Sequence, residues 1–239
     1  MSPAVFFAHS HTYIVASYSN LILGSQTSFS ALSTADIKAH LNITDSGQDS
    51  YVASLLAAAV VYVERRLQLD LRTTDWTLVL DQFPIWAAFN WLDRYGNNVY
   101  VYPAVSEYAV GRLTQRWQEI DLLRGPVQSI TSIQYYDPSN VLQTYSSANY
   151  ALVQPSFFPG RVEPIVFWPV SYPRPDAVQI QFVTGMTTPP ANILHALKLI
   201  CGQWYAAREN ISYGPGTVMG NTGCAVDALL DQFSVVGIG

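Results

Sequence analysis

The feature that most constrains the fold of this chain is a change in the spacing of its apolar residues along the sequence. In YVASLLAAAVVYVERRLQL, apolar side chains recur at the i, i+3, i+4, i+7 spacing of a helix, which predicts a helix over residues 50–69. From Thr74 to Gly185 the pattern instead alternates between apolar and polar residues in short runs. A helical pattern returns at 190–209. Helix, strand block and helix in this order predict an α+β fold rather than alternating βαβ units.

The strand block, residues 74–185, is predicted to form an antiparallel sheet or sandwich between the helices. Gly-Pro, Asp-Pro-Ser-Asn and Pro-Gly breaks separate its short strands. The candidate strands are DWTLVL, NNVYVYP, EIDLL, VQSITSIQYYD, NYALV, PIVFWP and AVQIQFVTG.

A shorter helix is predicted at 33–41, ahead of the long one. Ser33 or Thr34 can cap its free N–H groups, and Asp36 suits the positive end of the helix dipole. The polar stretch TDSGQDS separates the two helices, so we expect an N-terminal helical hairpin.

The C-terminal helix, residues 190–209, begins beside two prolines, which suit the first turn of a helix. At about 100° per residue its apolar side chains form one stripe, and His195 diverges from Cys201. The helix alone therefore cannot form a thiolate–imidazole pair. We interpret Cys201 as a buried core residue with a raised pKa and an inert thiol. The stripe consists of Leu194, Leu197, Cys201, Trp204 and Tyr205.

The chain divides into an N-terminal arm, residues 1–30, a core, residues 31–210, and a C-terminal segment, residues 211–239. The arm contains no Asp, Glu, Lys or Arg, and it either reaches a neighbouring molecule or adds a strand to its own domain. The C-terminal segment begins with the Gly-rich SYGPGTVMGNTG, interpreted as a flexible link. The short amphipathic helix CAVDALLDQF and an apolar end follow, and an apolar end is expected to dock on another surface.

The composition excludes several classes of protein. Only 12% of the residues are charged, against about 25% in ordinary soluble domains, which favours a surface that meets other protein. A net charge of −5 with two lysines argues against sequence-specific nucleic-acid binding. No stretch approaches the roughly 20 apolar residues of a membrane span. Two cysteines cannot form a disulfide framework, although a bond between Cys201 and Cys224 stays open.

Catalytic motifs are missing from the sequence. It has no HExxH, CxxC, GxSxG or P-loop pattern. The carboxylates that could form a hydrolase pair mostly lie beside turn residues, where local hydrogen bonding accounts for them. We therefore expect no enzyme activity, no cofactor and no metal site. Those carboxylates are Asp81, Asp93, Glu107, Glu119 and Asp121.

The order of several motifs resembles that of the gp6-like head–tail connector (adaptor) proteins of tailed bacteriophages and gene transfer agents. The resemblance begins with LSTADIKAHLNITDSGQDSYVASLLAAAVVYVERRLQLDL and WTLVLDQFP. It continues with LRGPVQSITSIQYYD, GRVEPIVFWP, VQIQFVTGMTTPPANILHALKLICGQWYAAREN and AVDALLDQF. Two parts depart from the family pattern: the arm is longer than usual, and residues 84–116 look like an insertion in the strand block.

The resemblance implies a structural virion protein of the neck, present in the host cytoplasm during assembly. Copies would form a ring, usually a dodecamer, that stacks on the portal protein and contacts the next neck or tail-completion protein. DNA would pass through the ring as non-specific cargo. The alternative function is a carbohydrate- or protein-binding β module of a phage tail or cell surface, because the aromatic residues of 86–117 could form a sugar-binding face.

Three sets of contact residues are expected. Glu64, Arg65 and Arg66 form either the solvated end of a helix or an inter-subunit salt bridge. The insertion would supply the tail-side contacts Trp86, Trp91, Tyr95 and Tyr100. The C-terminal segment would dock on the portal through its apolar side chains, namely Leu229, Leu230, Phe233, Val235, Val236 and Ile238.

Overall fold

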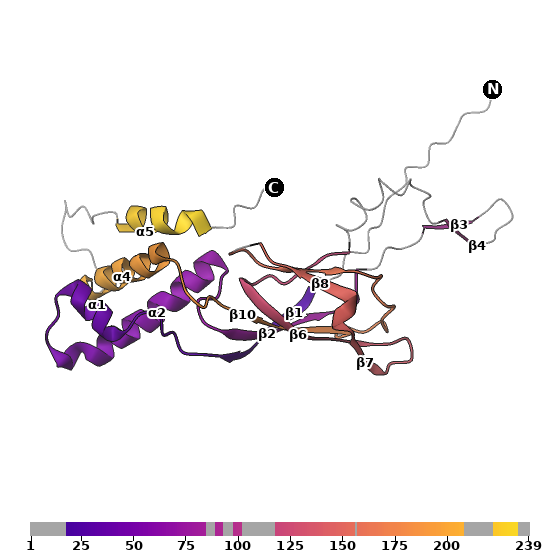
Figure 1. The fold of residues 1–239 in the computed structure, drawn as a ribbon, viewed down its shortest axis with the longest axis horizontal. Helices are drawn as coiled ribbons and strands as arrows, with labels where there is room; N and C mark the ends of the chain where they lie inside the picture. The colour runs from indigo at the N-terminus through magenta and orange to yellow at the C-terminus, as the bar shows by residue number, and fades with distance from the viewer. Residues whose placement is uncertain are drawn as a thin grey trace, which may run out of the picture.

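The computed structural model describes residues 18–84, 89–92, 98–101, 118–155, 157–207 and 222–233. These residues form an elongated molecule, with the helices at one end and the strands at the other (Figure 1). The α+β class is confirmed, and helices and strands lie largely end to end.

Four helices make up the helical end: α1 (Thr34–Leu41), α2 (Asp49–Leu67), α4 (Ala191–Ala206) and α5 (Thr222–Leu230). The first three lie close to the bounds predicted from periodicity. Ser33 and Asp36 form a capping box at the start of α1, so two backbone N–H groups that would otherwise lack partners are satisfied. A short 3-10 turn, η1 (Ser46–Gln48), precedes α2 and completes the helical hairpin.

The larger sheet has the order β1-β2-β10-β6-β7, and every neighbouring pair is antiparallel. A smaller antiparallel sheet has the order β5-β9-β8. The larger sheet consists of β1 (Tyr18–Gln26), β2 (Thr74–Leu80), β10 (Val178–Thr184), β6 (Val127–Tyr136) and β7 (Leu142–Tyr145). The smaller one consists of β5 (Ile120–Asp121), β9 (Arg161–Pro164) and β8 (Tyr150–Val153), with the 3-10 turn η3 (Ser147–Asn149) before β8.

Part of the N-terminal arm belongs to the chain's own sheet. Residues 18–26 form β1, an edge strand that pairs with β2. Of the two interpretations of the arm, the extra strand therefore holds for this stretch, while residues 1–17 lie outside the described part.

The expected strand PIVFWP is wrong. Strand β9 ends at Pro164, and the backbone N–H groups of Ile165 and Val166 both bond to the carbonyl oxygen of Asn149 instead of continuing a ladder. Pro169 has no N–H to donate. The side chain of Trp168 turns inward, where its Nε1 donates to the carbonyl oxygen of Gln118 at 2.7 Å.

Two separate hydrophobic cores hold the molecule together. The first lies among the helices and includes Ile37, Val63 and Leu197. The second lies among the strands, where the ring of Phe83 stacks on Trp168 at a centroid distance of 4.7 Å. The helices do not cover a face of the larger sheet, so the two ends are joined through the segments that run between the cores (Figure 1).

Candidate functional site

A buried carboxylate, Asp70, lies where the helical end meets the strands. Its side chain is fully buried and accepts hydrogen bonds from Trp76 Nε1 at 2.8 Å and Thr184 Oγ1 at 2.5 Å. It also pairs with the guanidinium of Arg124, whose carbon lies 5.3 Å from the centre of the Trp76 ring. Three chain segments therefore converge on one charge, and we call this group the polar junction.

Glycine at position 185 allows two of these segments to pass closely. Gly185 has a φ of 127°, in the region that only glycine adopts readily. A Cβ at this position would lie 2.5 Å from the carbonyl oxygen of Arg72. The strand that leaves the sheet and the chain that leaves α2 are thus fixed against each other beside the polar junction.

Glu64 does not form a solvated helix end. It is 4% exposed, and its carboxylate accepts from Arg72 Nη2 at 2.6 Å and from the backbone N–H of Leu71 at 3.0 Å. The chain reverses after α2 through Gln68, which has a φ of 55°, and this turn brings Arg72 back to Glu64. The Glu64 carboxylate, which was expected to face solvent or to pair with another subunit, is therefore bonded within its own chain.

Helix α5 packs on the rest of the helical end. Arg66 Nη1 lies 2.5 Å from Asp227 and Nη2 lies 3.6 Å from Asp231, so α2 and the α5 region share an ion-pair network. Leu230 and Phe233 are buried in the helical core. Phe233, in the 3-10 turn η4 (Asp231–Phe233), also meets the exposed Phe157 ring of the strand end at 5.4 Å.

The portal-docking prediction changes in consequence. Leu230 and Phe233 hold α5 to its own chain and do not face outward, whereas Leu229 is only partly buried. Val235, Val236 and Ile238 lie outside the described residues, as do residues 212–221 of the predicted Gly-rich link, whereas the last two residues of that link, Thr222 and Gly223, begin α5.

The tail-side residues also fall largely outside the described part. Trp91 lies in β3 (Phe89–Leu92) and Tyr100 in β4 (Asn98–Val101), two strands that form an antiparallel pair on their own. Their side chains are not described, nor are Trp86 and Tyr95. The sugar-binding face of the alternative function thus lies in a segment whose side chains the structure does not describe.

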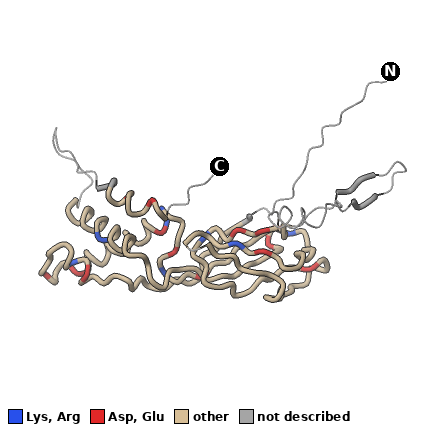
Figure 2. The backbone as a smooth tube through the Cα atoms, turned by 45° about the horizontal axis from the view of Figure 1, so that its top comes forward, with Lys and Arg blue, Asp and Glu red and all other residues tan. Residues whose placement is uncertain are grey.

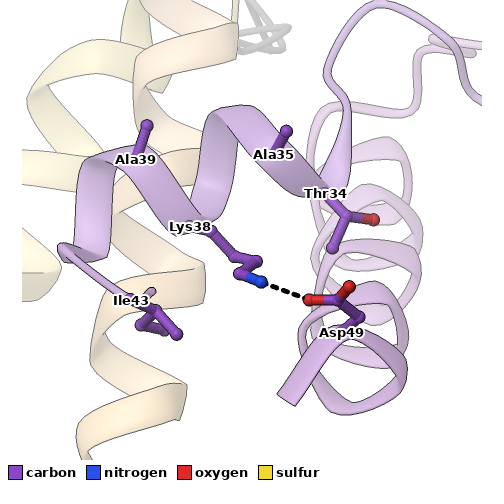
Figure 3. Close-up of a pocket in the computed structure, with 6 residues that line it drawn as sticks. All are labelled: Thr34, Ala35, Lys38, Ala39, Ile43 and Asp49. Carbon is purple, nitrogen blue, oxygen red and sulfur yellow. Dashed lines mark hydrogen bonds and ion pairs between the residues drawn. The ribbon is translucent and has the colours of Figure 1, made fainter. Parts of the chain in front are cut away.

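Among the hollows on the described residues are two at the helical end. The first, about 350 Å³, is lined by Thr34, Ala35, Lys38, Ala39, Ile43 and Asp49, and Lys38 and Asp49 form an ion pair across it (Figure 3). The second, about 580 Å³, lies between residues 28–34 and α2.

Neither a cluster of metal-ligating side chains nor a membrane-spanning helix occurs among the described residues. They contain no group of three or more His, Cys, Asp or Glu side chains that could hold a metal ion. None of the described helices is both long and apolar enough to cross a bilayer. Of the carboxylates considered for hydrolysis, Glu119 lies 3.2 Å from Arg161 in an ion pair.

Cys201 is buried, free and inert. Burial raises the pKa of its thiol from 9.0 to about 11, so almost no thiolate exists at neutral pH. The prediction of a core cysteine is confirmed. The side chain of Cys224 lies outside the described residues.

The strand end carries an exposed apolar surface. The segment after β9 includes Ile165, 66% exposed, and Phe167, 77% exposed. Tyr145, the last residue of β7, donates from its Oη to the Phe167 carbonyl, and the backbone N–H groups of Ile165 and Val166 donate to the carbonyl of Asn149, so this segment lies near the C-terminal end of β7. We define the apolar end surface as Val141, Leu142, Ile165, Val166, Phe167 and Val170.

Charged residues are few in the described part of the chain and occur at both ends of the molecule (Figure 2). None occurs from Pro138 to Gly160 or from Pro164 to Pro173, so the apolar end surface lies in an uncharged stretch of the chain. Asp137, which accepts from the Val141 N–H and the Gln143 side chain, and Arg174, which donates to Asn140, flank the β7 side of this surface. The exposed side chains of the surface itself are apolar, so contacts to them depend on apolar burial.

In a comparison with protein families, residues 33–119 match the model of the phage gp6-like head-tail connector protein family. The chain is similar to the gp6-like connectors. This match confirms the family resemblance for the part of the chain that contains the helical hairpin and β2. The matched family is a class of structural virion proteins rather than a class of enzymes. No curated protein matches the sequence.

Solved structures extend the likeness in fold to nearly the whole chain. A chain in the virion of a native gene transfer agent particle aligns with a TM-score of 0.62 and 19% identity, covering 92% of this chain and 97% of that one. A chain in the neck of an empty particle, computed with C6 symmetry, gives the same values. One in the neck of a native particle, computed with C12 symmetry, gives a TM-score of 0.57 and 20% identity, with 91% and 97% covered.

Proposed function

We propose that this chain is a structural connector in the neck of a phage-like particle, between head and tail. The observation that carries the proposal is the alignment of 92% of the chain with a chain of a gene transfer agent virion. The connector-family match over residues 33–119 supports it independently. The protein would be made in the host cytoplasm and remain in the virion neck.

Copies of the chain form a ring in this proposal. Two of the similar chains belong to necks computed with C6 and C12 symmetry, which favours a dodecamer stacked on the portal protein. DNA passes through the ring as non-specific cargo. The net charge of −5 supports this arrangement, because phosphates bind tightly only where cations gather.

The portal contact is assigned to α5 and the residues that follow it. Leu230 and Phe233 anchor α5 to its own subunit, so the contact itself falls to Leu229 and to the apolar Val235, Val236 and Ile238. This division is testable without disturbing the core. A chain truncated after Phe233 keeps the buried anchors and should lose portal-ring binding, while unchanged binding would refute the assignment.

Two further contacts complete the proposal. Arg65 remains for the inter-subunit salt bridge, because Glu64 and Arg66 have partners within the chain. Residues 84–116, with Trp86, Trp91, Tyr95 and Tyr100, contact the next neck or tail protein. Deleting residues 84–116 should abolish tail attachment and leave portal binding intact, and loss of both would reject this division.

The decisive experiment removes the gene from a particle-producing strain. We expect DNA-filled heads without tails, and restoration of tailed particles when the full chain is supplied in trans. Mass spectrometry of purified particles should find the chain in tailed particles. Tailed particles at normal numbers without the chain, or its absence from them, would overturn the proposal.

A further inference from the structure

Strand β7 offers an open edge beside the apolar end surface. It is the last strand in the order of the larger sheet, and in the described part of the chain β6 is its only strand partner. Edge strands are usually protected by charges or proline, and Leu142–Tyr145 contains neither. An extended segment could therefore add to this edge.

The apolar end surface must supply much of the affinity at this edge. With only four residues, β7 can give few main-chain hydrogen bonds. The segment bonded near the C-terminal end of β7 carries three of the most exposed apolar side chains of the described residues: Phe167 at 77%, Ile165 at 66% and Val170 at 60%. The combination of a short open edge and apolar side chains without charge suits an extended, apolar, uncharged peptide.

Residues 1–17 of this chain have that chemistry. They carry no Asp, Glu, Lys or Arg, and the run from Thr12 to Val15 consists of β-branched and aromatic residues. They immediately precede β1, which forms the opposite edge of the same sheet. Fully extended, they reach up to about 55 Å, well beyond the roughly 20 Å across a five-stranded sheet.

We propose that residues 1–17 of one copy bind the apolar end surface and the open edge of β7 on the next copy. This inference rests on the proposed connector function, because a ring needs two different surfaces that meet head to tail. The β1 edge, where the arm leaves the sheet, and the β7 edge, where it binds, are two such surfaces. Each arm then links neighbouring subunits around the ring.

Site-specific photo-crosslinking tests the proposal. Two versions of the full chain are produced together: one carries benzoylphenylalanine at Phe167 but lacks residues 2–17, and the other has its arm and no crosslinker. A crosslink between them within assembled particles should map by mass spectrometry to residues 1–17. A crosslink to another protein or another segment, or none in particles that contain both versions, would overturn it.

A reversed pairing separates binding to the next copy from binding to the same copy. Here the version with the crosslinker keeps its arm, and its companion lacks residues 2–17. Arm crosslinks formed only within single chains would refute the link between subunits. Benzoylphenylalanine at Tyr62, exposed on α2 at the far end, is the control and should give no arm crosslink.

Two matched substitutions add a quantitative readout. Phe167→Ser should reduce recovery of the chain in tailed particles by about tenfold or more, because it removes a central apolar contact. Phe158→Ser, at a 38% exposed phenylalanine outside this surface, should have little effect. Equal losses would contradict the proposal. If the unmodified chain is absent from particles, both proposals fail; if it is present without arm crosslinks, only this one fails.

Discussion

Replacing Asp70 should destabilise the protein far more than replacing a surface carboxylate that is also paired. Asp70→Ala removes a fully buried acceptor and leaves Trp76 Nε1, Thr184 Oγ1 and the guanidinium of Arg124 without it. The side chain of Arg124 is only 17% exposed, so water restores little. Breaking a buried pair by removing one partner costs about 3–5 kcal/mol, a large share of the roughly 5–15 kcal/mol that stabilises a domain.

Asp49→Ala is the matched control. It breaks the Lys38 ion pair, but the Asp49 side chain is 55% exposed, and such surface pairs contribute up to about 1 kcal/mol. Urea unfolding followed by tryptophan fluorescence gives both free energies, with similar m-values required for the comparison. A difference of less than about 1 kcal/mol between the variants would refute the role assigned to Asp70.

A double substitution identifies the cause of the loss. If a stranded charge is responsible, Asp70→Leu combined with Arg124→Met should recover part of the stability lost in Asp70→Ala, since removing both charges of a buried pair is often neutral. No recovery would indicate that the hydrogen bonds to Trp76 and Thr184 dominate.

Three further predictions follow from burial and charge. Cys201 should resist alkylation by iodoacetamide in the folded chain. Because burial raises the pKa of its thiol to about 11, the contribution of the buried thiol to the free energy of unfolding should be complete below pH 9 and should decline as the pH rises towards 11. Urea unfolding at several pH values measures this decline. Leu230→Ala, at a fully buried side chain, should cost about 2–5 kcal/mol, and the partly buried Leu229→Ala less. Ring association measured by sedimentation should change little between 50 and 500 mM salt; steep weakening would show that charge pairs hold the subunits together.

The helices were predictable because their signals are local. The bounds of α1 and α2 follow from caps and from apolar spacing over neighbouring turns, all within one stretch of sequence. The strand β7 was not predicted from the sequence. Leu142–Tyr145 buries only its last residue, so its sequence does not show the alternation of apolar and polar residues that marks a half-buried strand. Its presence depends on pairing with β6, which propensity alone does not indicate.

The polar junction was also beyond a reading of local pattern. Asp70 is a single carboxylate in QLDLR, and its partners Arg124 and Thr184 lie 54 and 114 positions further along the chain. Glu64 stands beside two arginines in the sequence, which indicated a solvated cluster, yet its partner Arg72 arrives only after the left-handed turn at Gln68. Both the polar junction and the Glu64–Arg72 pair depend on turns of the chain that bring distant residues together, and these turns are not visible in the local sequence pattern.

The ion pairs within the chain explain how its few charged residues are used. Most of the described cations already pair with carboxylates of their own chain, so few remain for neighbours. They are Lys38, Arg66, Arg72, Arg124, Arg161 and Arg174. Exposed apolar side chains, in contrast, lie at both edges of the larger sheet. Ile22 and Leu23 are exposed on the β1 edge, and the apolar end surface lies near β7 at the other edge. In the proposed ring, charge pairs stabilise each subunit and the apolar edges join it to the next.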